Sequence, residues 1–91
     1  MISIETSLGW LANDLPQVLN LHYELRLTGI VHTDEGVTLN IIAPATKVVW
    51  MLVVVKALRH LNAYLSPQRY RFVQKRSIGR SVQLRFVCDP S

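Results

Sequence analysis

Residues 21–42, LHYELRLTGIVHTDEGVTLNII, decide the fold of this 91-residue chain. Apolar and polar side chains alternate on both sides of a polar segment at residues 33–36. A period of two is typical of half-buried strands, and Gly36 is free to adopt a positive φ at the end of a turn. The stretch therefore predicts a β-hairpin. Its apolar face consists of Leu21, Tyr23, Leu25, Leu27, Val31, Val37, Leu39 and Ile41, and the polar face of its first strand consists of His22, Glu24, Arg26, Thr28 and His32.

A second alternation runs from Gln68 to Cys88 around a turn at residues 76–80. The apolar face of this predicted hairpin consists of Tyr70, Phe72, Val82, Leu84, Phe86 and Cys88. Its outer face and tip are cationic and carry Arg69, Arg71, Lys75, Arg76, Arg80 and Arg85. Because arginine forks match the geometry of phosphates and carboxylates, these six side chains are the candidate surface for an acidic partner or nucleic acid.

A helix is expected before the first hairpin. Three leucines recur there at spacings of three and four residues, and Thr6 or Ser7 precedes them as an N-cap. These leucines are Leu8, Leu11 and Leu15. Pro16 has no N–H to donate, so it is expected to kink or restart the helix.

A second helix is expected over residues 47–65, with Thr46 as its N-cap. Its apolar arc is wider than the usual stripe of about 100°. Since one sheet cannot cover so wide an arc, the excess is expected to meet the first helix, another subunit, or both. A homodimer is favoured, and its candidate interface consists of Trp50, Val53, Ala57 and Tyr64.

A short strand over Met1–Glu5 completes an expected order of β-α-β-β-α-β-β. The first six elements resemble the split βαβ arrangement called ferredoxin-like, a likeness of element order that implies no function. The sequence thus predicts one α+β domain over residues 1–91. Its antiparallel sheet has four to five strands, with two helices on one face and a C-terminal β-hairpin.

Acidic and basic residues are separated along the chain. Residues 1–35 hold five acids against one base, a net charge of −4, and residues 36–91 hold nine bases against one acid, a net charge of +8. The two halves add up to the net charge of +4. Acids of the first half, Glu24, Asp34 and Glu35, are therefore expected either to neutralise the basic hairpin or to leave it for a partner.

Residues that would support catalysis or metal binding are scattered. His22 and His32 lie ten residues apart on one strand, too far to share a metal at about 3.3 Å per residue. His60 stands alone, and Cys88 falls on an apolar face, where an inert thiol is expected. No enzyme activity, metal or cofactor is predicted.

Two observations bear on location. The single cysteine excludes an internal disulfide, and the first ten residues lack the features of a signal peptide. The longest apolar stretch, residues 48–58, falls short of the roughly 20 residues that a membrane span needs. A cytoplasmic protein without a transmembrane segment is therefore expected.

These patterns together predict a small, self-associating, non-enzymatic interaction module that presents its basic hairpin to an acidic protein partner. The alternative is a protein that binds the backbone of RNA or DNA through the same hairpin. The aromatic side chains of this hairpin fall on its apolar face, so such binding would depend on charge and not on base stacking.

Overall fold

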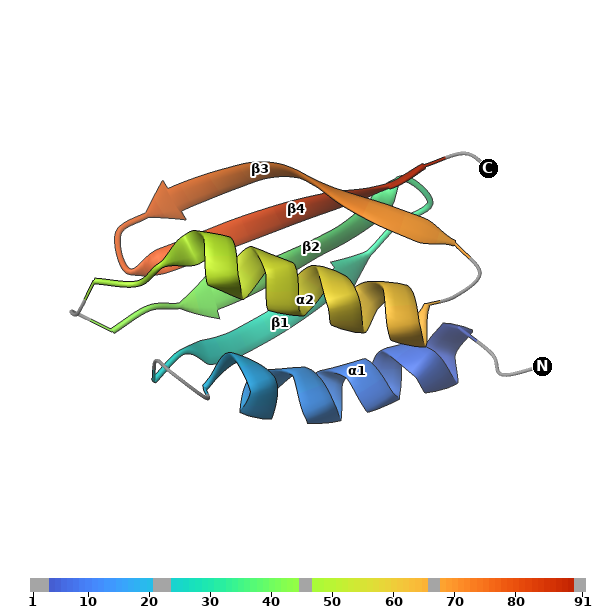
Figure 1. Cartoon of the computed structure of the whole chain (residues 1–91), viewed down its shortest axis with the longest axis horizontal. Helices are drawn as coiled ribbons and strands as arrows, with labels where there is room; N and C mark the ends of the chain where they lie inside the picture. The colour runs from blue at the N-terminus through green and yellow to red at the C-terminus, as the bar shows by residue number, and fades with distance from the viewer. Residues whose placement is uncertain (1–3, 21–23, 45–46, 66–67, 90–91) are drawn as a thin grey trace.

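The computed structural model describes residues 4–20, 24–44, 47–65 and 68–89. The elements in chain order are α1 (Ile4–Leu19), β1 (Arg26–His32), β2 (Gly36–Ile42), α2 (Trp50–Tyr64), β3 (Arg69–Ile78) and β4 (Ser81–Asp89). The four strands form one antiparallel sheet in the order β1-β2-β4-β3, and both helices cover the same face (Figure 1). The predicted α+β, ferredoxin-like class is confirmed.

The strand predicted over Met1–Glu5 is not found at Ile4 and Glu5, which belong to a helix. Helix α1 begins at Ile4, and residues 1–3 lie outside the described part of the chain. Strand β4 pairs antiparallel with both β2 and β3, so β2 and β3 run parallel and are joined by α2. This is a split βαβ unit in which the inserted strand comes last in the chain.

The core lies between the sheet and the helices. Leu11 and Leu15 of α1, Ala57 and Leu61 of α2, and the central strands are closed to solvent there. The fully buried side chains of β2 and β4 are Leu39, Ile41, Leu84 and Phe86. Because α2 presents the small Ala57 to the core, it can approach the sheet and α1 closely.

Helix α1 continues through Pro16 to Leu19, so the break predicted at this residue is absent. Pro16 lies in the penultimate turn, and the Asn20 N–H still bonds to its carbonyl at 3.0 Å. Helix α2 begins at Trp50 and not at residue 47. Val49 caps it in extended geometry with no side-chain hydrogen bond, and the predicted cap, Thr46, lies outside the described residues.

Each edge strand contains a β-bulge. In β1 the register shifts between Leu27 and Gly29, and in β3 it shifts between Phe72 and Gln74. A bulge adds one residue to a strand and so reverses which face the later side chains occupy. Val31, predicted for the apolar face, consequently lies on the open face opposite Thr38 and is 49% exposed.

Gly36 is required for close packing and not for a positive φ, because the positive-φ glycine among the described residues is Gly79. A Cβ at Gly36 would lie 2.0 Å from the Phe86 carbonyl oxygen and 2.7 Å from the Val87 Cα. Backbone atoms in a sheet cannot move aside as a flexible side chain can. The close pairing of β2 with β4 therefore depends on this glycine.

We expect Gly36→Ala to lower the free energy of unfolding by about 1–3 kcal/mol. Gly9→Ala is the matched control, because a Cβ at Gly9 meets nothing within 4 Å. That exchange in a helix should raise stability by roughly 0.5–1 kcal/mol. Urea denaturation of both variants measures the difference, and equal midpoints would contradict the steric argument.

Candidate protein-interaction site

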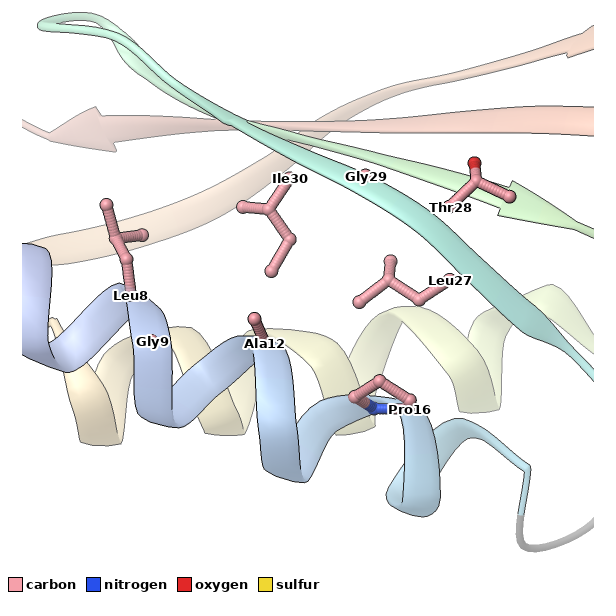
Figure 2. A pocket seen from close by; sticks show the side chains of 8 residues that line it. All are labelled: Leu8, Gly9, Ala12, Pro16, Leu27, Thr28, Gly29 and Ile30. Atoms are coloured by element: carbon pink, nitrogen blue, oxygen red, sulfur yellow. The ribbon is translucent and has the colours of Figure 1, made fainter.

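An apolar groove lies between α1 and the edge strand β1 (Figure 2). It has a volume of about 420 Å³. Its lining consists of Leu8, Gly9, Ala12, Pro16, Leu27, Thr28, Gly29 and Ile30. We call this feature the α1–β1 groove.

Local geometry on both sides explains the groove. Leu8, Ala12 and Pro16 recur every four residues, so they share one face of α1. On β1, the bulge brings both Leu27 and Ile30 to the side of the helices, where they pack partly against the core. The small side chains of α1 leave space between these two apolar rows. The groove is thus a product of the bulge and of missing side-chain volume.

Strand β1 is an edge of the four-stranded sheet, so one side of its backbone faces no other strand of the described sheet. The hydroxyl of Thr28, the bulged residue, donates to the Asn40 carbonyl of β2 at 3.0 Å. This bond holds the bulge against β2. It does not involve the backbone groups on the outer side of β1. Sequence reasoning missed the groove, although Gly9, Ala12 and Gly29 are the small residues that could have indicated it.

Two of the four residues of the predicted oligomer interface are not on the surface. Val53 and Ala57 are buried in the core. Trp50 is half-buried, with the Lys75 ammonium 5.2 Å from its ring centroid, and the Tyr64 hydroxyl donates to the Asp14 carboxylate of α1. The exposed apolar side chains of α2 are instead Met51, Leu52 and Val55.

The cationic hairpin is divided between two faces. The bulge in β3 places Lys75 opposite the buried Leu84, on the side of the helices, whereas Arg69 and Arg71 lie on the open face of the sheet. Arg76 and Arg85 also lie on the open face, where they line one hollow with Glu35, and Arg80 lies at the turn. The six cations therefore do not form the single surface that alternation predicts.

Two ion pairs neutralise part of the open face. The Arg71 Nε lies 2.6 Å from Asp89, and the Arg85 guanidinium lies 3.4 Å from Glu35. All four side chains are largely exposed, so each pair stabilises the fold by less than about 1 kcal/mol. Glu24 lines a shallow hollow beside β1 with Arg26, at the opposite edge of the sheet from β3.

The histidines and the cysteine lie apart. The His60 Nδ1 is 3.3 Å from the Lys56 carbonyl, and its ring is 5.9 Å from that of Tyr64. His32 faces the helix side opposite Val37, and Cys88 is half-buried opposite Tyr70. His22 lies outside the described residues.

Within the described ranges, no three His, Cys, Asp or Glu side chains gather as metal ligands would. In the same ranges, no helix has the length and hydropathy to span a bilayer.

Comparison with known proteins gives a fold and no family. No protein-family model matches the chain, and no curated protein matches it in sequence. Among solved structures, the crystal structure of the periplasmic domain of XcpY, in its oP crystal form, is similar with a TM-score of 0.51. The match covers 96% of this chain and 100% of that one at 16% identity. A likeness at this identity establishes a shared fold.

This neighbour contradicts two expectations drawn from the sequence. It is a periplasmic domain, which overturns the cytoplasmic location. It also overturns the predicted function, in which the basic hairpin meets an acidic partner or a nucleic-acid backbone. The hairpin itself explains the second error, because a bulge divides its cations and two of them already have acidic partners. The first error arose because a single cysteine excludes an internal disulfide without specifying a compartment.

The contact between Tyr64 and Asp14 joins the two helices and yields a titration prediction. The hydrogen bond to Asp14 is the main cause that raises the pKa of Tyr64 above its ordinary 10.0, with desolvation and the carboxylate charge adding to it. The fold thus favours the neutral phenol. The contribution of the neutral Tyr64 phenol to the free energy of unfolding is complete below pH 10.0. It is lost as pH rises through the raised pKa of Tyr64.

We expect Asp14→Ala to lower the pKa of Tyr64 toward 10.0. Tyrosinate absorbance, titrated in the wild type and the variant, measures the shift. Asn13→Ala, one residue away on the exposed side of α1, should leave the titration unchanged. Identical curves for Asp14→Ala and the wild type would show that the carboxylate does not hold this proton.

Proposed function

We propose that this chain is a periplasmic protein-interaction domain of a secretion apparatus. XcpY, whose periplasmic domain shares the fold, is a component of a type II secretion system. The observation that carries the proposal is that the similarity extends over all of that periplasmic domain and nearly all of this chain. From this neighbour we infer a role as a small domain that contacts other proteins.

The α1–β1 groove is the surface that best suits a partner. Free N–H and C=O groups along an edge strand pair with another extended segment, and neighbouring pockets accept its alternate side chains. Here β1 provides the edge, and Leu8, Leu27 and Ile30 provide the apolar pocket. The occupant we propose is an extended segment of another component of the apparatus, with apolar side chains at every second position.

The bulge limits where such a segment can pair. Bulges interrupt regular pairing and protect edges from unselective association. Regular pairing is therefore expected along Gly29–His32, beyond Thr28, while the apolar side chains of the partner reach back over Leu27. A short, interrupted edge of this kind selects a partner by its side chains and discourages general aggregation.

Self-association remains a proposal for the same edge. In this arrangement a second copy contributes a segment to the groove, and the buried Val53 and Ala57 take no part in the contact. Two-fold pairing of β1 with β1 would bring two α1 helices together over the junction. A segment from a different protein avoids that crowding, so it is the favoured occupant.

Location is tested by protease accessibility of the full-length protein in spheroplasts. We expect externally added protease to digest the domain while a cytoplasmic marker in the same preparation stays intact. Detergent lysis is the control, because it should expose both proteins. Protection of the domain together with the marker would place it in the cytoplasm and overturn the proposal.

The groove is tested with a photo-crosslinking amino acid placed at Ala12 or, as the matched control, at the exposed neighbour Asn13. We expect an adduct from position 12 in living cells, identified by mass spectrometry as a component of a secretion apparatus, and little from position 13. An adduct of two copies of this chain would identify the occupant as a second subunit. Equal labelling from both positions would remove the groove from the proposed function.

A further inference from the structure

Three segments distant in sequence meet at one end of the molecule. The Ala43 N–H, just after β2, donates to the Arg80 carbonyl in the β3–β4 turn at 3.0 Å. The Lys75 ammonium lies 5.2 Å from the ring centroid of Trp50, the first residue of α2. Figure 1 shows the end of β2, the start of α2 and the β3–β4 turn gathered there. We call this region the turn end.

The turn end exposes large apolar side chains. Met51 is 71% exposed, Ile78 is 54% exposed and Leu52 is 49% exposed. Single exposed apolar residues are ordinary on protein surfaces, but several at one end indicate contact with something apolar. Val49 and Ile42 are exposed at the same end.

The same end carries cations. They are Lys47 just before α2, Lys75 beside Trp50 and Arg80 in the β3–β4 turn, whereas Arg76 lines a hollow on the open face with Glu35 and Arg85. The first turn of α2 contains no acidic residue, so the positive end of the helix dipole adds to this charge. Glu24 is the nearby acid, and it lies beside Arg26 in the hollow next to β1.

The opposite end of the molecule carries both acids and arginines, and two of its acids are paired. The Cys88 N–H donates to the Glu35 carbonyl at 2.8 Å, which places the β1–β2 turn beside the end of β4. Both ion pairs found in the described residues use acids of this end, Glu35 with Arg85 and Asp89 with Arg71. The turn end is therefore the strongly cationic end of an asymmetric molecule.

We propose that the turn end docks on an anionic lipid surface. Exposed apolar side chains flanked by lysine and arginine are the composition of interfacial membrane contacts, in which the apolar groups enter the headgroup region and the cations meet lipid phosphates. A second copy fits less well, because Glu35 and Asp89 at its opposite end are already paired with its own arginines. The contact we propose is peripheral, with the apolar groups at the level of the headgroups.

Binding of the purified chain to vesicles tests this proposal without reference to a secretion apparatus. We expect cosedimentation with vesicles of phosphatidylcholine mixed with phosphatidylglycerol, weak cosedimentation with phosphatidylcholine alone, and release by salt. A Trp10→Phe variant leaves Trp50 as the sole tryptophan, and its emission should shift to the blue on anionic vesicles. Equal binding to both kinds of vesicle, or none to the anionic kind at low salt, overturns the proposal.

Matched variants locate the contact. Arg80→Gln should weaken binding about fivefold, whereas Arg69→Gln, at the opposite end beside Asp89, should change it little. Leu52→Ser should also weaken binding, whereas Val31→Ser should not, although both side chains are 49% exposed in the wild type. Equal losses within either pair would show that charge or hydrophobicity acts without regard to position and would overturn the assignment to the turn end. If the protease experiment in spheroplasts failed while vesicle binding was retained, only the proposed secretion role would be rejected.

Discussion

The insertion of β4 between β2 and β3 is the constraint on which the rest of the structure depends. Strand β4 pairs along its length with both neighbours and supplies Leu84 and Phe86 to the centre of the core. Gly36 permits the close approach of β2 to β4. Because β4 fills the middle of the sheet, β1 and β3 become its edges, and the two turns that join the hairpins point to opposite ends of the molecule.

The sequence predicts the elements and their layers well, because periodicity reports which residues are apolar at regular spacing. Both hairpins, both helices and the ferredoxin-like class follow from it. Periodicity does not reveal where a strand contains an inserted residue. Thr28 and Val73 each reverse the alternation of an edge strand. The faces predicted for Val31 and His32 in β1 and for Lys75 in β3, which follow these bulges, are therefore wrong. The position of β4 could not be predicted either, since it depends on pairing between distant segments.

The wide apolar arc of α2 shows a second limit of prediction from the sequence. An arc broader than the core can cover must leave apolar residues outside, and the sequence cannot say which ones. Val53 and Ala57 were assigned outward, yet they pack inward, and Met51, Leu52 and Val55 lie outside. The prediction of surplus apolar surface was sound, but its location required the packed structure.

The two proposed surfaces use different parts of this architecture and are geometrically compatible. The groove runs along β1, and the strands follow the long axis of the molecule (Figure 1). The turn end lies at one extremity of that axis. A domain that stood on a membrane by this end would hold the groove upright and open along its side. An extended partner segment could then pair with β1 without displacing the lipid contact, so both surfaces could be occupied at once.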